Sequence, residues 1–368
     1  MRILIYNWRD LKHPLAGGAE VYTDAVATEW VRMGHTVVLF CSHVEGEPTR
    51  DVTSGGYSVI RRGKKHRVYY EAKRFWKMEG EGNFDLVIDE VNTRPFFCHR
   101  FAKGVQVMVL IHQIAREVWF YESAFPIALL GRFFLEPWWL WRLRNQDIVT
   151  VSDSSRKSMM TYGANRVRIV PEGFRDLEIP SVDKEATPTL VFLGRLSSNK
   201  RPSHAIRVFE KVRGVMPDVK MWIIGDGPER ARLERRSIEG VEFLGRISES
   251  EKVKRLCAAH LLLVTSVREG WGMVVTEAAH VGTLSAGYDV PGLRDSLRLH
   301  GGIAVKPRPR ELASVVVSVL RGERNELVTD GIETKGILHW SDVAEAILGP
   351  SRADYEETSD LLKARGGM

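Results

Sequence analysis

Short apolar runs alternate with longer amphipathic segments along most of this sequence. In the first half the runs are RILIYNW, HTVVLFCS, FDLVIDEV, VQVMVLIH and QDIVTVS, which begin at residues 2, 35, 84, 105 and 146. In the second half they are TLVFLGRL, VKMWIIGDG, VEFLGRI, LLLVTSV and GTLSAGY, which begin at residues 189, 219, 241, 261 and 282. Their length and β-branched content are typical of buried strands. The alternation predicts an α/β fold with doubly wound parallel sheets.

The pattern divides the chain into two halves. It stops at 175–188, RDLEIPSVDKEATP, a polar stretch with two prolines that is typical of a linker. We therefore expect two Rossmann-like domains, at 1–176 and 187–338, and a C-terminal helix at about 340–368 that packs on the first. Domains of this kind bind ligands at the carboxyl ends of their strands, in a cleft where the two domains face each other.

Helix-end signals place two helices in the first half. AEVYTDAVATEWVRMG, from Ala19, is amphipathic and closes at Gly34. DSSRKSMMTYG follows a strand and has Ser152 or Asp153 as its candidate N-cap.

Composition narrows the class of protein. The net charge of +6 suits an anionic ligand, an anionic membrane surface or nucleic acid, and it equally suits a solvated basic surface. Because Cys41, Cys98 and Cys257 form no CxxC pair, zinc and iron–sulfur sites are not expected, and so sparse a count indicates a reducing compartment. No signal peptide and no uncharged run long enough to span a membrane are recognisable. We expect a cytoplasmic protein, either free or at the inner face of the membrane.

The segment REGWGMVVTEAAHVGT carries two glutamates, Glu269 and Glu277, eight residues apart. On one helix they would lie about 12 Å apart, too far for the carboxylate pair of a retaining glycosidase, which needs about 5–5.5 Å. We therefore expect Glu269 in a loop and Glu277 in the helix that follows. Gly270 and Gly272 allow a sharp turn and a close approach to a ligand, and the first amides of the helix can bind an anion. The segment predicts a site for phosphate and hydroxyl groups.

Other chemistry-bearing residues also follow predicted strands. Gly194 and Arg195 end one run, with Lys200 five residues on, and His112 ends another. The Gly225–Gly227 turn ends a third, and its aspartate fits an ordinary turn residue. No GxGxxG follows the first strand, and no GxxxxGK[ST] occurs, so a nicotinamide-binding Rossmann domain and a P-loop are not indicated.

These motifs, taken in order, resemble glycosyltransferase family 4. The resemblance rests on Gly17-Gly18-Ala19-Glu20, on Gly194-Arg195 with Lys200, on GDGP and FLGRI, and on the Glu269–Glu277 pair. It covers the chain from residue 3 to about 345. It implies the GT-B fold and a retaining transfer from a nucleotide-diphosphate sugar.

The resemblance also implies roles for individual residues. Arg195 and Lys200 would bind the donor diphosphate, unless they are a solvated basic pair. Glu277 would accept hydrogen bonds from the ribose, and the alternative is an ordinary surface glutamate. His112 would lie beside the donor sugar, or it would be a satisfied core histidine. The remaining donor-site residues are Glu269 at the transferred sugar, Gly270, Gly272, Met273 and Val274 at the phosphate and sugar hydroxyls, Gly17 and Gly18 over the diphosphate, and the backbone of Arg246 and Ile247 at the base.

Two stretches depart from the family pattern. The common GTPV is GTLSAGYDV here, so the loop at 282–289 differs. After the third parallel strand, where many members carry a histidine, this chain has the run Asp89-Glu90-Val91-Asn92. Acceptor recognition usually lies on that side, so the identity of the acceptor stays open.

The segment 124–146, AFPIALLGRFFLEPWWLWRLRNQ, mixes aromatic residues with arginines. Such a mixture forms either an interfacial membrane helix or a buried core with a rim of arginines. The first half, near 125–135, is the better membrane candidate, and the second half matches a scaffold helix. No basic cluster accompanies a known nucleic-acid-binding module, so nucleic acid is not an expected partner.

The sequence therefore predicts a hexosyltransferase. Its donor would be a UDP- or GDP-sugar, and its acceptor a hydroxyl of a glycan or lipid-linked glycan. We expect no metal and no further cofactor, with His112 and Glu269 as the catalytic candidates and a front-face route that retains configuration. A sugar-nucleotide epimerase on the same fold and a non-catalytic glycan binder are the alternatives.

Overall fold

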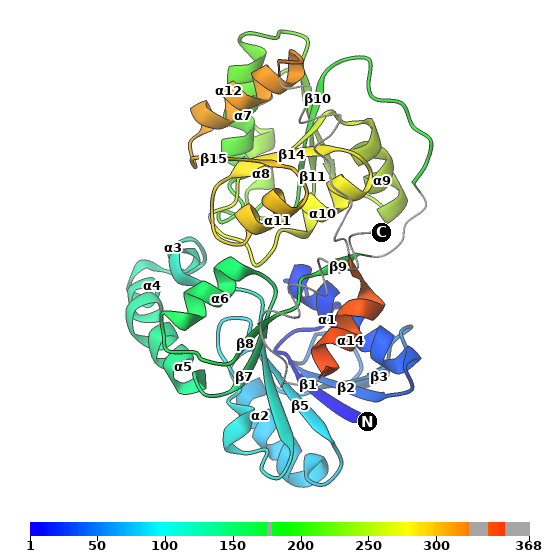
Figure 1. Ribbon diagram of the computed structural model, residues 1–368, viewed down its shortest axis with the longest axis vertical. Helices are drawn as coiled ribbons and strands as arrows, with labels where there is room; N and C mark the ends of the chain where they lie inside the picture. The colour runs from blue at the N-terminus through cyan, green and yellow to red at the C-terminus, as the bar shows by residue number, and fades with distance from the viewer. Residues whose placement is uncertain (175–178, 324–337, 350–368) are drawn as a thin grey trace. The chain divides into compact units, whose positions relative to one another are not determined.

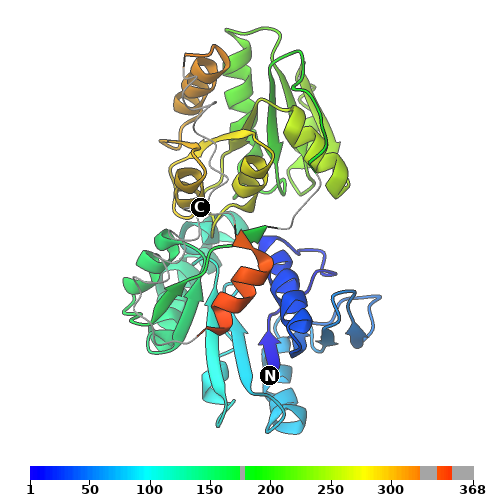
Figure 2. The same ribbon diagram turned by 45° about the vertical axis from the view of Figure 1, so that its right-hand side comes forward.

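A computed structural model describes residues 1–174, 179–323 and 338–349. The described residues divide into two compact units. Unit 1 contains 1–116, 129–174 and 338–349, and unit 2 contains 117–128 and 179–323. Each unit has its own sheet and its own core (Figures 1 and 2).

The sheet of unit 1 has the strand order β3-β4-β2-β1-β5-β6-β7-β8. Neighbouring strands from β4 to β8 are parallel, whereas β3 joins β4 as an antiparallel hairpin. The strands are β1 Arg2–Tyr6, β2 Thr36–Cys41, β3 Arg50–Val52, β4 Ser58–Arg61, β5 Leu86–Glu90, β6 Gln106–Ile111, β7 Asp147–Thr150 and β8 Val167–Ile169. The hairpin was not predicted, because its strands are short and lack a long apolar run.

Helices connect these strands and pack on the sheet. They are α1 Gly18–Arg32, α2 Val68–Phe75, α5 Glu136–Leu143, α6 Asp153–Met160 and α14 Trp340–Leu348, with π-helical turns η1 Trp76–Gly80 and η4 Gly131–Leu135 and the 3-10 turn η2 Cys98–Arg100. Between β6 and η4, α3 Trp119–Glu122 and most of the 3-10 turn η3 Arg116–Val118 and of α4 Phe125–Leu130 group with unit 2. Ser152 is the N-cap of α6, where its hydroxyl accepts a hydrogen bond from the amide of Ser155.

The last described helix, α14, lies beside α1 (Figures 1 and 2). The indole of Trp30 donates a 2.9 Å hydrogen bond to the carbonyl of Ala344, and the guanidinium of Arg168 reaches the carbonyls of Ala346 and Ile347. A short pair, β9 Gly173–Phe174 and β16 Leu338–His339, leads into it. The rest of the helix that we expected, residues 350–368, lies outside the described residues.

The sheet of unit 2 has the order β12-β11-β10-β13-β14-β15, and its pairs are parallel. The strands are β10 Thr189–Leu193, β11 Lys220–Ile224, β12 Val241–Gly245, β13 Leu261–Val264, β14 Leu284–Tyr288 and β15 Ile303–Val305. The helices are α7 Pro202–Arg213, α8 Arg230–Glu234, α9 Glu249–Ala258, α10 Met273–His280, α11 Leu293–Leu299 and α12 Pro309–Leu320. The predicted α/β class with doubly wound parallel sheets is confirmed in both units.

The strand order of unit 2 determines which loops meet. β10 lies between β11 and β13, although β13 comes much later in the chain. The loops that follow β10 and β13 therefore leave the same edge of the sheet side by side. Those loops carry the Arg195–Lys200 and Glu269–Gly272 motifs.

Candidate active site

Lys200 and Glu269 form a close ion pair in unit 2. The ammonium of Lys200 donates to both oxygens of Glu269, at 2.5 and 2.7 Å, and the hydroxyl of Ser266 donates to Oε1 at 2.6 Å. The Glu269 side chain is only 10% exposed, whereas that of Lys200 is 31% exposed. Burial makes this carboxylate dependent on its donors. The sequence motifs do not link Lys200 to Glu269, and they give no role to Ser266.

The loop that carries Glu269 is held by a close backbone approach. A side chain at Gly292, which has φ +80°, would put its Cβ 2.0 Å from the carbonyl oxygen of Glu269. Gly272, at φ +95°, is the N-cap of α10. Only glycine adopts such angles without strain. The two glycines therefore fix where Glu269 sits and where the first amides of α10 begin, at Met273 and Val274.

Glu277 lies in α10 and Glu269 lies in the preceding loop, as the spacing predicted. The carboxylate of Glu277 pairs with the ammonium of Lys252 in α9 at 3.0 Å. Burial lowers the pKa of Lys252, but the carboxylates of Glu277 and Glu249 outweigh it and the pKa is raised. Lys252 is thus a cation throughout the physiological range and lies against the carboxylate of Glu277. Lys252 was not predicted as a partner, because no local pattern links α9 to α10.

The other predicted donor residues lie at loops of the same unit. Arg195 follows β10 and is exposed, and Arg246 and Ile247 follow β12, just before α9. Gly270 follows Glu269 directly and is partly exposed. The amide of Gly227 donates a 2.7 Å hydrogen bond to the carboxylate of Asp226, which fits the turn role expected for this aspartate.

Gly17 and Gly18 lie in unit 1, at the start of α1, and both are exposed. Gly17 is the N-cap, and its amide donates to the carboxylate of Glu20 at 2.7 Å. Glu20 is buried and also accepts from Arg9 at 2.9 Å and from Asn92 at 3.0 Å. Burial is the largest influence on Glu20 and raises its pKa. This network orders the glycine turn. In the sequence, Glu20 is recognisable only as part of the Gly17-Gly18-Ala19-Glu20 motif.

His112 also lies in unit 1, directly after β6, and it is buried. Its Nε2 is 3.4 Å from an oxygen of Glu90, and its Nδ1 is 3.7 Å from an oxygen of Glu172. Burial lowers the pKa of His112, but the two carboxylates have a larger, opposite effect, and the pKa is raised to about 9. Neither glutamate was a candidate from the sequence, although Glu90 lies in the run that departs from the family pattern.

Asp89, in the same run, has a structural role. Asp89 is buried, and its carboxylate accepts hydrogen bonds from the amides of Phe96 and Cys98 at 2.9 and 3.0 Å. Burial is the largest influence on Asp89 and raises its pKa. Its two hydrogen bonds hold a loop in which Thr93 and Phe97 have positive φ, at 101° and 59°. Such strain persists only where the surroundings hold the backbone.

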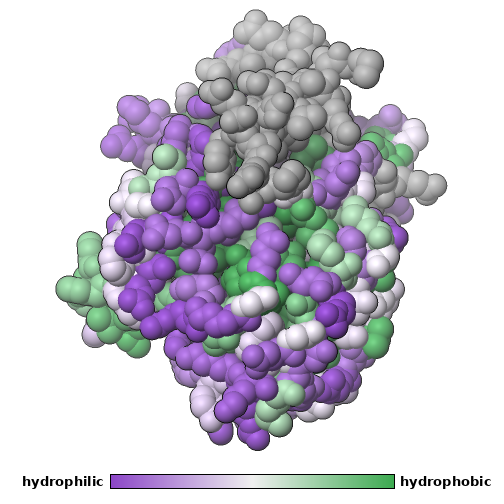
Figure 3. All heavy atoms as spheres, turned by 60° about the horizontal axis from the view of Figure 1, so that its bottom comes forward, coloured by the Kyte–Doolittle hydropathy of each residue, from purple (hydrophilic) through white to green (hydrophobic). Residues whose placement is uncertain are grey.

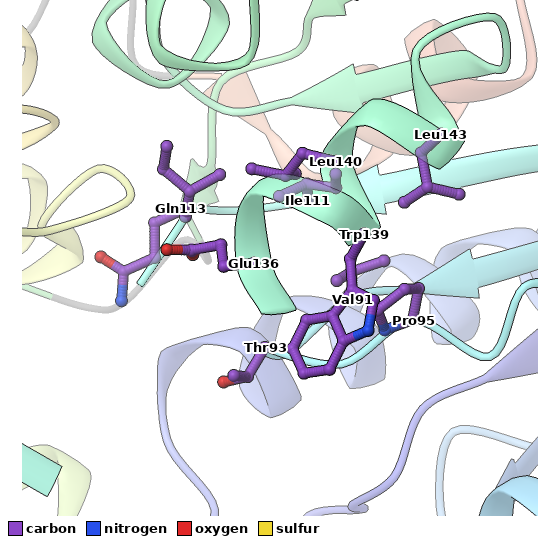
Figure 4. A pocket seen from close by; sticks show the side chains of 10 residues that line it. Val91, Thr93, Pro95, Ile111, Gln113, Glu136, Trp139, Leu140 and Leu143 are labelled. Atoms are coloured by element: carbon purple, nitrogen blue, oxygen red, sulfur yellow. The ribbon is translucent and has the colours of Figure 1, made fainter. Parts of the chain in front are cut away.

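A small hollow lies beside this loop (Figure 4). It has room for at most about one water molecule, so it does not accommodate a sugar in this form. The residues that line it are Val91, Thr93, Pro95, Ile111, Gln113, Ile114, Glu136, Trp139, Leu140 and Leu143. The carboxylate of Glu136 accepts hydrogen bonds from the amides of Ala115 and Arg116. These bonds hold the backbone shortly after His112 in place.

The aromatic segment separates into buried and exposed positions. In α5 the side chains of Trp139, Leu140 and Leu143 are buried, which confirms a scaffold role for that face of the helix. The large apolar side chains that are 48–68% exposed between 130 and 141 are Leu130, Phe133, Phe134, Trp138 and Trp141. We call these five residues the aromatic surface. Figure 3 shows hydrophobic side chains gathered on the side where α4 lies in Figure 1.

No helix among the described residues is long and apolar enough to span a bilayer.

Comparisons with known proteins agree with these features. The family "Glycosyltransferase Family 4" matches residues 16–176, and "Glycosyl transferases group 1" matches residues 175–333. A GDP-mannose-dependent alpha-(1-6)-phosphatidylinositol dimannoside mannosyltransferase of Mycobacterium tuberculosis is 32% identical over 340 residues, which cover 85% of this chain and 86% of that protein. This chain belongs to glycosyltransferase family 4.

A second relative is more distant but covers more of the chain. The gpi3 subunit of a phosphatidylinositol N-acetylglucosaminyltransferase from Schizosaccharomyces pombe is 27% identical over 363 residues, covering 91% of this chain and 77% of that protein. Family 4 membership and these relatives make the chain a glycosyltransferase that uses a nucleotide-sugar donor.

Solved structures show the same fold. A sucrose-phosphate synthase from Thermosynechococcus elongatus aligns with a TM-score of 0.75 at 18% identity, covering 99% of each chain. Anabaena HepE in complex with UDP and glucose aligns with a TM-score of 0.66 at 16% identity, covering 99% of this chain and 100% of that one. At this identity the likeness establishes the fold, which is the predicted GT-B fold.

The ion pair at Glu269 leads to a test of stability. Lys200→Ala should destabilise the family 4 enzyme by about 1–3 kcal/mol, because it leaves a buried carboxylate with a hydroxyl donor in place of a cation. Adding Glu269→Gln should recover most of that loss, since the neutral amide needs no counter-ion. Thermal melts of the single and double variants form the cycle. Lys211→Ala, at the exposed far end of α7, is the matched control. Equal melting of Lys200→Ala and wild type would contradict the assignment.

Proposed function

We propose that this chain is a retaining hexosyltransferase. It moves a hexose from a UDP- or GDP-sugar to a hydroxyl group of a glycan or lipid-linked glycan. The nucleotide would bind unit 2 at the loops after β10, β12 and β13, with Arg195 and Lys200 at the diphosphate and Glu277 at the ribose. His112 would contact the donor sugar. The domain boundaries at 176 and 187 belong to the same proposal.

The hydrogen bonding of Glu269 carries the proposal. Both of its oxygens accept strong donors, from Lys200 and from Ser266. A carboxylate engaged in this way is a poor nucleophile, because its lone pairs and charge are already stabilised. Glu277 is likewise engaged, with Lys252. Neither glutamate is therefore suited to form a covalent glycosyl intermediate, the route that a double displacement requires.

A front-face route needs no such nucleophile. The acceptor oxygen forms a bond to the anomeric carbon on the face from which the diphosphate leaves. The bond from that carbon to the phosphate oxygen breaks, and the acceptor proton moves to the departing phosphate oxygen. Arg195, Lys200 and the first amides of α10 would stabilise the charge that grows on the diphosphate.

Calorimetry tests the diphosphate assignment. A thermal-shift panel of UDP-, GDP- and ADP-sugars first identifies the base, since a ligand of the folded state raises the melting temperature. Arg195→Ala and Lys200→Ala should then weaken binding of the matching nucleoside diphosphate about ten- to a hundredfold. Nucleoside binding should not change, because it involves no charge partner. Lys211→Ala should bind both ligands like wild type. Equal losses for nucleoside and diphosphate would reject the assignment.

The stereochemistry of the product tests the reaction. An early NMR time course on an α-linked donor should show an α-linked product. A β-linked product would refute the front-face route. The same donor incubated without acceptor separates the epimerase alternative, which would convert the donor by itself.

The aromatic surface supports a membrane-associated acceptor. The guanidinium groups of Arg132, Arg142 and Arg144 lie over the rings of Phe133, Trp138 and Trp141, at 5.2, 5.7 and 4.0 Å. Exposed rings with cations among them suit the interface of an anionic membrane. Both relatives named above carry phosphatidylinositol in their names. We place the acceptor lipid at the cytoplasmic face.

Liposome sedimentation checks this contact. The protein should sediment with phosphatidylglycerol vesicles at low salt and less at high salt, because screening weakens the arginine contribution. The double substitution Phe133→Ser with Phe134→Ser should abolish most of the sedimentation with these vesicles. The control pair is Tyr70→Ser with Met78→Ser, which are 65% and 63% exposed on other helical segments. Identical sedimentation of the two double variants would exclude the aromatic surface as the contact.

A further inference from the structure

The imidazole of His112 lies between two buried carboxylates. Glu90, the last residue of β5, faces Nε2, and Glu172, between β8 and β9, faces Nδ1. The side chains are 7%, 0% and 7% exposed for His112, Glu90 and Glu172. The ring of Tyr22 packs edge-on against the imidazole, with centroids 4.6 Å apart. This packing and the flanking strands fix the orientation of the ring.

The arrangement favours a charged imidazole. A neutral imidazole donates from one nitrogen and directs the lone pair of the other at a carboxylate, which repels it. The imidazolium carries a proton on each nitrogen, so each carboxylate faces a positively charged N–H at ion-pair distance. The hydroxyl of Thr23 donates a 2.6 Å hydrogen bond to the second oxygen of Glu90 and so fixes the position of that carboxylate beside the ring. The two carboxylates therefore favour the protonated ring more than burial opposes it, in keeping with its raised pKa.

Other charged groups face the cluster. Glu20, in α1, lies close enough to Glu90 for the charge of Glu90 to raise its pKa. At Tyr22, Glu172 raises the pKa of the hydroxyl and Arg168, in β8, lowers it. Arg168 is itself held by carbonyls of α14 and lies 3.7 Å from Asp147. The guanidinium opposes the protonation of His112 and the carboxylates favour it, but the carboxylates lie directly against the ring nitrogens.

A metal site does not explain the cluster. Metal ligands converge on one point, whereas the two glutamates here lie against opposite nitrogens of one ring. Among the described residues, no group of three or more His, Cys, Asp or Glu side chains has a geometry that could hold a metal ion.

We propose that Glu90 and Glu172 are positioning residues that hold His112 as an oriented imidazolium through the transfer reaction. The charge state concerns unit 1 alone, and its consequence for catalysis rests on the function proposed above. A histidine that keeps both protons is a fixed positive charge near the donor sugar, and it cannot take the acceptor proton as a general base. The proton then goes to the departing phosphate oxygen, while His112 gains and loses nothing.

The charge state can be measured without any substrate. In protein labelled with 15N-histidine, long-range 1H–15N spectra report the protonation of both ring nitrogens, and His112→Gln identifies the signals of His112. We expect both nitrogens to be protonated at pH 7.5 and to titrate near pH 9. Glu90→Gln and Glu172→Gln should each lower that midpoint by about one pH unit or more. Glu81→Gln, an exposed carboxylate in unit 1, should leave it unchanged.

Two results would overturn the proposal. One is a His112 that is neutral at pH 7.5 in the wild-type protein, a measurement that stands even where a variant fails to fold. The other is an unchanged midpoint in both folded glutamine variants. Neither depends on the enzyme's activity, so a failure here is distinct from a failure of the proposed transfer.

The kinetic arm then links the charge to catalysis. With the donor identified, wild-type kcat should stay level below pH 8 and fall as pH rises through the pKa of His112. In Glu172→Gln the fall should move to lower pH, and kcat at pH 7.5 should drop about tenfold or more. Nucleoside diphosphate affinity should stay unchanged. A drop in kcat with an unshifted pH profile would assign Glu172 a merely structural role and refute the proposal.

Discussion

The ion pair between Lys200 and Glu269 joins the two loops from which the candidate donor site of unit 2 is built. The residues lie far apart in the chain, on loops that follow β10 and β13, and they meet because those strands are neighbours in the sheet. A buried carboxylate without its cation would be costly. The pair therefore constrains both loops at once, and through the turn at Gly272 it also determines where α10 begins.

The sequence predicted elements better than it predicted partnerships. The long apolar runs became strands, and the two glycines correctly separated Glu269 in a loop from Glu277 in a helix. Ser266, three residues before Glu269, is the one partner within local reach, and an interaction of side chain with side chain at that spacing has no distinctive pattern. Lys252, Glu90 and Glu172 come from other elements. Their contacts depend on strand order and helix packing, which local periodicity does not encode.

Short elements escaped prediction for a different reason. β3, β8, β9 and β15 have two or three residues each. Two or three residues cannot show a period, so only their place beside a longer strand makes them strands. For the aromatic segment the sequence left two alternatives open, an interfacial membrane helix and a buried core with a rim of arginines. In its second half, the burial along α5 follows the helical period and shows one buried face. Trp139 is buried, whereas Trp138 and Trp141, on the other side of the helix, are exposed.

The charged groups around the proposed reaction share one property. Glu269 is bound to Lys200, Glu277 to Lys252, and His112 lies between two carboxylates. Each group lies against a partner whose charge is opposite to that of its own ionised form, so a proton moved onto or off any of them would disturb that pairing. An enzyme that relied on a general base would need a group poised to accept a proton near neutral pH. In the proposed reaction, the acceptor for the proton of the attacking hydroxyl is the phosphate oxygen that becomes free as the bond to the anomeric carbon breaks. The same pairings that stabilise the folded units thus favour a transfer in which the substrate supplies its own base.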